Sequence, residues 1–358
     1  MNLTEVTIPL SVTSIEKGAF IGCNLLKTIT ITSSVTSIGQ SVFILCVLLE
    51  KVIFNTPCSL KSIGSRAFSQ CYSLKTITIP SSVTSIGEEA FNDCSSLESI
   101  SFESPSSLKE IKDNTFFLCT ALAKIAIPSS VRSIGKSAFY ECISLEDVTF
   151  EKNSILNLID FNSFAYCSSL EKLLIPPTVP CIEPFAFHEC SSLQQIQIPS
   201  NLDIVEFSVF KGCSSLCEIT IPHEITFAAN STLRVIRNDA FSLFLSLSKI
   251  EFPNTVVQID KFAFVECRKL TKIKIPPFLD KTSDGLFINC DGLKQVSIPS
   301  NVVAIGESSL EGCSSLANIS FENLSNIRSI GDRAFNDCTS LNRFQIPSSV
   351  VSIGQDIF

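Results

Sequence analysis

Apolar residues return along this chain at a nearly fixed interval. A phenylalanine recurs every 23 or 25 residues, with a single step of 31 between Phe210 and Phe241, and Leu310 fills the one position where it is missing. A fixed period in this range is typical of a solenoid, in which each repeat stacks on its neighbours. The column comprises Phe20, Phe43, Phe68, Phe91, Phe116, Phe139, Phe164, Phe187, Phe210, Phe241, Phe264, Phe287, Phe335 and Phe358.

Two hydrophobic patterns follow one another within each repeat, as the unit 79–101 shows (IPSSVTSIGEEAFNDCSSLESIS). Its last residues alternate between apolar and polar, which predicts a short strand with one buried face. A preceding set of apolar residues is spaced by three and four, which predicts one or two helical turns. That set comprises Ala90, Phe91, Cys94 and Leu97.

A unit of 23 residues with a strand and a turn cannot bury its own apolar face, so the units must stack with parallel strands. We therefore predict an α/β repeat solenoid, a curved array with a parallel concave sheet and short helical turns or loops on the convex side. We expect one domain over 1–358, with about 15 units of 23–25 residues and one of 31 at 221–251. Both ends fall within a repeat, which makes end-to-end self-association of two copies an expectation.

The repeat motif resembles a known family. The pattern I-P-x-x-V-x-x-I-G-x-x-A-F-x-x-C-x-x-L-x-x-I, found at 79–101 and 127–149, resembles the BspA-like, or Treponema pallidum-type, leucine-rich repeats. The resemblance covers essentially the whole chain, and its serine, isoleucine and cysteine content is similar to that of surface antigens of parasitic protists such as Trichomonas and Entamoeba. It implies non-enzymatic protein–protein recognition, with adhesion to host or extracellular-matrix components through the concave face. The alternative is an intracellular leucine-rich-repeat scaffold or signalling adaptor.

Sixteen cysteines invite a disulfide or metal interpretation, but thirteen of them occupy one repeat position. Phe244 fills that position once, which indicates that the column is buried and that its thiols behave as small hydrophobic groups. No C-x-x-C spacing indicates a zinc site. Cys58, Cys181 and Cys217 lie outside the column and are candidates for exposed, oxidisable thiols. So many unpaired cysteines favour a reducing compartment, and therefore the scaffold alternative.

Composition narrows the function further. A net charge of −8 argues against nucleic-acid binding, and no apolar run is long enough to insert into a membrane. The resemblance implies a cell-surface or secreted location. A cytoplasmic location is the alternative, because residues 1–6 lack the basic and apolar regions of a secretory signal. No nucleophile, phosphate-binding or zinc-protease motif occurs, so we predict no enzymatic activity, no cofactor and no metal site.

Partner-binding residues are expected where the repeats vary on the outward face of the strands. Lys249, Lys272 and Lys274 form a local basic spot there, and Glu251 and Lys172 lie in the same outward columns. Phe227 is the apolar residue expected at the tip of the loop inserted in the longest repeat. The competing interpretation of the lysines is a solvated face that discourages strand pairing between molecules.

Overall fold

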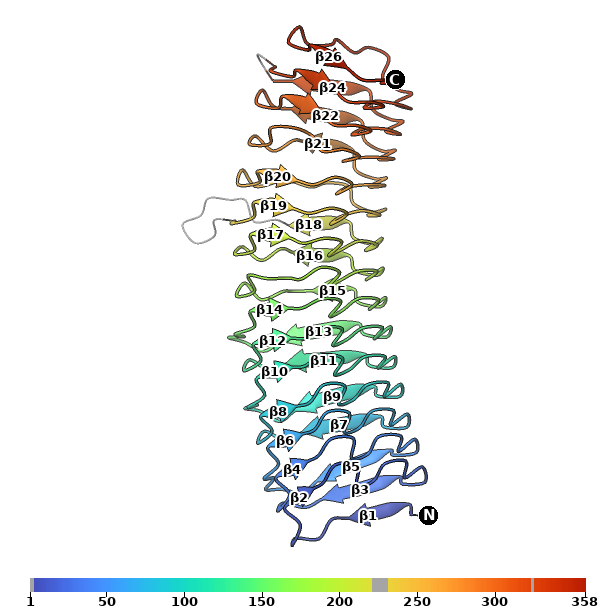
Figure 1. Ribbon diagram of the computed structural model, residues 1–358, viewed down its shortest axis with the longest axis vertical. Coiled ribbons are helices and arrows are strands. Elements are labelled where there is room, and N and C mark those ends of the chain that lie inside the picture. Colours follow the sequence, from blue (N-terminus) through green and yellow to red (C-terminus); the bar gives the residue numbers. More distant parts are fainter. Residues whose placement is uncertain (1–2, 221–230, 323–324) are drawn as a thin grey trace. The chain divides into compact units, whose positions relative to one another are not determined.

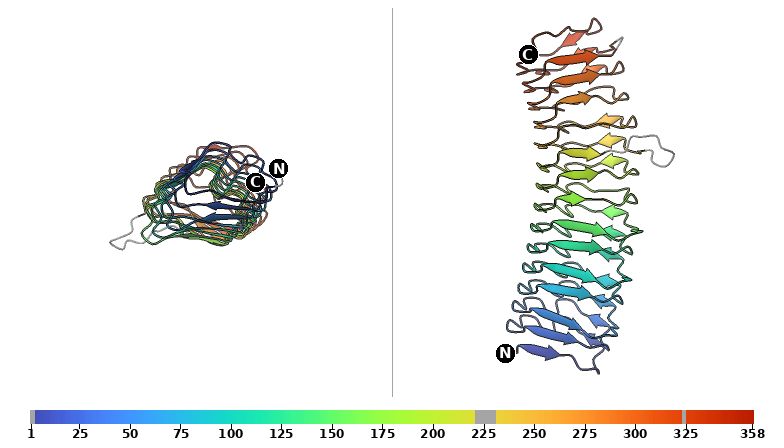
Figure 2. Two further views of the ribbon diagram at one scale, coloured as in Figure 1. Left: turned by 90° about the horizontal axis from the view of Figure 1, so that it is seen from below. Right: turned by 180° about the vertical axis from the view of Figure 1, so that it is seen from behind.

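The computed structural model describes residues 3–220, 231–322 and 325–358 (Figure 1). The chain forms two compact units, Met1–Thr178 and Val179–Phe358, and each is described by itself. In both units every repeat makes one rung, and the rungs stack with their strands in parallel (Figure 2). The predictions of one continuous array and of end-to-end self-association stay predictions.

Most described rungs contribute a strand of two to four residues to one side, which we call the strand face, and a two-residue strand to another side, the short-strand face. On the strand face, unit 1 has β1 (Glu5–Thr7), β3 (Thr28–Ile31), β5 (Lys51–Phe54), β7 (Thr76–Ile79), β9 (Ser99–Phe102), β11 (Lys124–Ile127), β13 (Asp147–Phe150) and β15 (Lys172–Leu173). Unit 2 has β16 (Gln195–Gln197), β18 (Glu218–Thr220), β21 (Lys272–Lys274), β22 (Gln295–Ile298) and β24 (Asn318–Phe321).

The short-strand face is built in the same way. Unit 1 contributes β2 (Ser14–Ile15), β4 (Ser37–Ile38), β6 (Ser62–Ile63), β8 (Ser85–Ile86), β10 (Glu110–Ile111), β12 (Ser133–Ile134) and β14 (Leu158–Ile159). Unit 2 contributes β17 (Ile204–Val205), β19 (Val235–Ile236), β20 (Gln258–Ile259), β23 (Ala304–Ile305), β25 (Ser329–Ile330) and β26 (Ser352–Ile353).

The register joins equivalent repeat positions. Lys124 pairs with Asp147, and Asp147 with Lys172, so that each outward column predicted from the sequence is a row of neighbours in the sheet. Side chains alternate along each strand, and in β7 Thr76 is exposed whereas Ile77 is buried. The predicted parallel sheet with one buried face is therefore confirmed.

The predicted helical turns are wrong, because no helix occurs in the described part of the chain. Two residues in the turn segment of each complete repeat adopt left-handed backbone angles, as Glu89 (φ 56°) and Asp93 (φ 55°) do in the fourth repeat, and they interrupt any helix. Some backbone N–H groups of this segment donate within their own rung, and others donate to the next rung. Ala90 donates within its own turn to Gly87, while Glu89 donates to the carbonyl of Asp113 in the next rung.

The phenylalanine column forms the centre of each unit. From Phe20 to Phe164 in unit 1, successive rings stack with centroids 4.9–5.6 Å apart. In unit 2 the pairs from Phe187 to Phe287 stack at 5.3–6.0 Å. Offset stacking of this kind adds roughly 0.5–1.5 kcal/mol per pair to the burial of the rings. Leu310, which interrupts the column, is also buried.

The cysteine column is buried as predicted, except that Cys23 is half-buried. The thiols also make a contact that the sequence analysis did not anticipate. Most of these thiols donate to the carbonyl of the column phenylalanine in the preceding rung, at 3.1 Å from Cys94 to Phe68 and 3.2 Å from Cys119 to Phe91. The cysteines are therefore both core residues and links between rungs.

Candidate partner-binding surfaces

The strand face of unit 2 carries most of the residues predicted to bind a partner. Lys272 and Lys274 lie on β21 with exposed side chains, separated by the buried Ile273. Lys249 and Glu251 occupy the equivalent positions one rung earlier and are also exposed. The sequence therefore placed these four side chains correctly on the solvent side of the sheet.

Carboxylate groups lie close to two of the lysines of this spot. The ammonium group of Lys249 lies 2.6 Å from the carboxylate of Glu251, and that of Lys274 lies 3.6 Å from Glu322, whose rung is two strands away. These pairs are largely exposed, so each contributes no more than about 1 kcal/mol to stability. The spot is consequently a mixed pattern of charges rather than a purely basic one.

Lys172, the other lysine predicted to bind, lies on β15 in unit 1 next to Asp147 of β13. Two residues further on, Leu174 is 77% exposed in the same column as the small side chains of Ala126 and Thr149. A single exposed leucine is an ordinary feature of a protein surface and does not by itself mark a binding site. Phe227 lies outside the described residues.

Hydroxyl groups connect neighbouring rungs on the strand face. The hydroxyls of Thr78 and Ser101 are 2.9 Å apart in unit 1, and those of Ser297 and Ser320 are 3.0 Å apart in unit 2. These side chains are short and tied to one another, so they lose little rotamer freedom on binding. They form a comparatively rigid part of the strand face.

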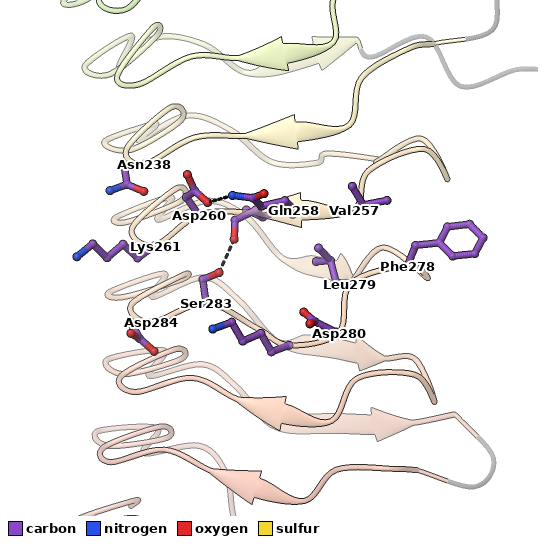
Figure 3. A pocket seen from close by; sticks show the side chains of 12 residues that line it. Asn238, Val257, Gln258, Asp260, Lys261, Phe278, Leu279, Asp280, Ser283 and Asp284 are labelled. Carbon is purple, nitrogen blue, oxygen red and sulfur yellow. Dashed lines mark hydrogen bonds between the residues drawn. The ribbon is translucent and has the colours of Figure 1, made fainter.

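A cleft on the short-strand face of unit 2 was missed by the sequence analysis. Its volume is about 680 Å³, and Figure 3 shows it between β20 and the segment of the next rung that bears Asp280 and Ser283. Its lining combines apolar side chains (Val257, Leu279 and Phe278) with amide, hydroxyl and charged ones. Clefts that combine an apolar wall with a few polar groups are typical binding sites.

The cleft coincides with a change in a core column. The central isoleucine of the short strands, represented by Ile259 and Ile305 in the flanking rungs, is replaced by Thr282. Thr282 is buried, and its hydroxyl oxygen accepts hydrogen bonds from the N–H of Gly306 and the hydroxyl of Ser309, both at 3.0 Å. Its own N–H donates to Ala304. This polar interruption of an apolar column is the sequence signal that could have located the cleft.

The titratable side chains of the described part of the chain form no metal site, and one of the two histidines is packed against a phenylalanine. No group of three or more His, Cys, Asp or Glu side chains there is arranged to hold a metal ion. His188 lies edge-on to Phe185 with ring centroids 5.6 Å apart, and burial lowers its pKa, which is consistent with a packing role. The same residues include no helix suited to crossing a bilayer.

Comparison with known proteins identifies the repeat. A family model described as "BspA type Leucine rich repeat region (6 copies)" matches residues 1–119, 49–157, 153–234 and 234–358. The chain belongs to the BspA-type leucine-rich repeat family. Repeats of this type generally bind proteins without catalysis, and the match indicates no catalytic family. No curated protein matches the chain.

Solved structures support the assignment of this BspA-type chain. A leucine-rich repeat protein from Bacteroides ovatus ATCC 8483 is 25% identical, with a TM-score of 0.70, and the match covers 98% of this chain and 92% of that one. The pneumococcal vaccine antigen PcpA is 21% identical, with a TM-score of 0.56 and coverage of 90% of each chain. The second likeness shows the shared fold alone.

Proposed function

We propose that this BspA-type protein is a non-enzymatic adhesin that binds a host-cell or extracellular-matrix protein through its strand face. The observation that carries the proposal is the outward half of the parallel sheet, where exposed side chains repeat in register while their neighbours are buried. Such a face presents a broad surface at a fixed spacing, which suits recognition of another protein surface. Family membership supports the protein–protein part of the proposal.

The side chains on the strand face of unit 2 favour a partner with its own mixed charges. Lys272 and Lys274 present ammonium groups, and Glu251 and Glu322 place carboxylates close by. Complementary charges of this kind accelerate encounter and select the partner more than they raise affinity. Binding should therefore weaken as the salt concentration rises.

The second candidate function, an intracellular scaffold, is favoured by the cysteine column. Thiols such as Cys94 and Cys119 are buried and reduced, and their hydrogen bonds to the neighbouring rung require the S–H form. A reducing compartment would preserve them most readily. The adhesin and the scaffold would use the same strand face, and they differ in whether the partner lies outside or inside the cell.

Two experiments test the proposal. Antibody labelling of intact cells of the source organism should detect the protein without permeabilisation, and detection after permeabilisation alone would favour the scaffold. Binding of the purified protein to intact host cells should fall by about tenfold when Lys249, Lys272 and Lys274 are changed to glutamate, a loss worth about 1.4 kcal/mol. The triple reversal of Lys61, Lys109 and Arg132 to glutamate, at exposed positions directly before short strands of unit 1, makes the same change in net charge and serves as the control. Binding that survives the triple reversal would remove the basic spot from the proposal.

A further inference from the structure

The turn segments of the first two repeats present apolar side chains to solvent. In the second rung Leu45 is 41% exposed and Leu48 is 38% exposed. This rung is packed between two others, since the ring of Phe43 stacks on the column rings on both sides. In the first rung Ile21 is 54% exposed and Leu25 is 41% exposed. Four large apolar side chains are therefore exposed on two adjacent turn segments.

The following repeats show that the core does not require leucine at these positions. The positions of the two exposed leucines in the second rung hold Gln70 and Ser73 in the third repeat, and Asp93 and Ser96 in the fourth. The third and fourth rungs pack in the same way, with stacked column rings. Adjacent apolar side chains that packing does not require, and that remain exposed, indicate an interaction surface.

The exposed side chains and two half-buried neighbours form a continuous surface, which we call the turn patch. It comprises Ile21, Leu25, Ile44, Leu45, Val47 and Leu48. The two turn segments are held side by side, because the N–H of Gly22 donates to the carbonyl of Ile44 at 2.9 Å. Four side chains exposed to this extent present roughly 300 Å² of apolar surface, a size at which patches on monomers often have a function.

Opposite charges border the turn patch at equivalent positions of its two rungs. Lys27 follows Leu25 by two residues, and Glu50 follows Leu48 by two. The ammonium and carboxylate groups lie 3.8 Å apart, and both side chains are more than half exposed. The turn patch itself contains no charged side chain. An apolar centre with one positive and one negative group at its border can complement a second copy of itself.

A two-fold axis brings these groups together when it lies in the interface, runs along the rungs and passes midway between them. The first rung of one copy then packs against the second rung of the other. Lys27 of each copy faces Glu50 of the other, and Leu25 faces Leu48. Both charges and all exposed apolar groups thereby obtain a matching group in the other copy.

We propose that the chain forms a two-fold dimer through the turn patch of unit 1, with the two stacks of rungs running in opposite directions. Two such patches with their charged borders bury roughly 1,000 Å² in total, near the lower limit of specific interfaces, so the dimer is weak and dissociates in the micromolar range. The turn patch lies outside the strand face, so the dimer is independent of the proposed adhesion.

Sedimentation velocity of the full chain tests this inference. Between about 1 and 200 µM it should show monomer and dimer in equilibrium, with a dissociation constant on the order of 10 µM. Leu45→Asp with Leu48→Ser introduces the residues of the fourth repeat, so the fold should be kept, and dimerisation should weaken by at least about tenfold. Leu245→Ser removes a single exposed leucine from a turn segment of unit 2 and should change nothing.

A chain that stays monomeric over this range would overturn the inference and leave the turn patch to a different protein. A dimer that the double variant does not weaken would overturn it as well. Loss of host-cell binding by variants of the strand face, or its absence altogether, would contradict only the proposed adhesion.

Charge reversal tests the arrangement of the two copies. Lys27→Glu and Glu50→Lys should each weaken self-association by about tenfold, because like charges then face each other twice across the axis. An equimolar mixture of the two variants should associate as the unchanged protein does, since both pairs across the interface again join opposite charges. A mixture that stays as monomeric as each variant alone would overturn the two-fold arrangement.

Discussion

The thiol of Cys94 donates a hydrogen bond to the main-chain carbonyl of Phe68, 3.1 Å away in the preceding rung. That carbonyl also accepts the N–H of Cys71, which belongs to its own rung. One buried oxygen thus receives two donors and links two repeats. The same arrangement at Cys46, Cys119 and Cys142 explains why this position holds cysteine rather than an aliphatic residue.

Replacing Cys94 by alanine should lower the free energy of unfolding by about 1–2 kcal/mol. The change removes a fully buried sulfur and leaves the carbonyl of Phe68 with one donor fewer. Urea unfolding followed by circular dichroism measures the loss. The exposed Cys217 serves as the control, and Cys217→Ala should change stability by no more than about 0.5 kcal/mol. Equal effects at the two positions would contradict the assigned role of the column.

Stability should fall steeply above pH 9. Burial raises the pKa of Cys94 from its ordinary value of 9.0 to about 12, and that of Cys46 likewise to about 12. The stabilising effect is complete below pH 9, because both states then carry the proton. Between pH 9 and 12 the unfolded chain loses the proton first, so each such thiol removes up to about 1.4 kcal/mol per pH unit. Unfolding midpoints measured from pH 8 to 11 check this, and Cys94→Ala should reduce the slope.

The phenylalanine column should tolerate leucine far better than alanine. Phe91 stacks between Phe68 and Phe116, with centroids 5.3 and 5.6 Å away. Phe91→Ala should cost about 3–5 kcal/mol through lost burial and a cavity, whereas Phe91→Leu should cost about 1.5 kcal/mol or less. Leu310 shows that the column accepts leucine. Urea unfolding of both variants measures the difference, and an equal loss would mean that ring stacking rather than volume dominates.

Alkylation should distinguish the two groups of cysteine. At pH 8, iodoacetamide should modify the exposed Cys217 within minutes and leave Cys94 and Cys119 unmodified in the folded protein, since a buried thiol with a raised pKa forms little thiolate. Mass spectrometry of proteolytic fragments gives the extent at each site. Modification of Cys94 at the rate of Cys217 would show that the column is open to solvent.

The repeat, its parallel sheet and its buried columns could be predicted because each position is sampled many times within one sequence. The helical turns could not, since the spacing of Ala90, Phe91 and Cys94 is shared by a helix and by a series of turns bonded to the next rung. Left-handed angles at Glu89 and Asp93 decide between them, and neither residue is a glycine. The close contact of Gly87 with the neighbouring rung could not be predicted from the sequence either. A Cβ at this position would lie 2.6 Å from the carbonyl carbon of Gly64.

The candidate sites were harder to predict than the fold. The outward position of Lys272 and Lys274 follows from strand alternation, but the carboxylate partner of Lys274 does not. Glu322 reaches Lys274 from a rung two strands away, and that contact depends on side-chain geometry. The cleft lies beside a rung in which one polar residue, Thr282, replaces the isoleucine of the core column. When the repeats are summarised as one motif, a substitution in a single repeat is not visible.

The central claim is that the strand face binds the partner, and a bulky substitution there tests it most directly. Ser297 lies on β22, half-exposed and between Lys274 and Ser320 in the outward column. Saturable binding of labelled protein to intact host cells should fall by about tenfold or more for Ser297→Trp, and should be unchanged for Lys61→Trp on the short-strand face of unit 1. Equal binding by Ser297→Trp and the unchanged protein, with both variants folded, would contradict the claim.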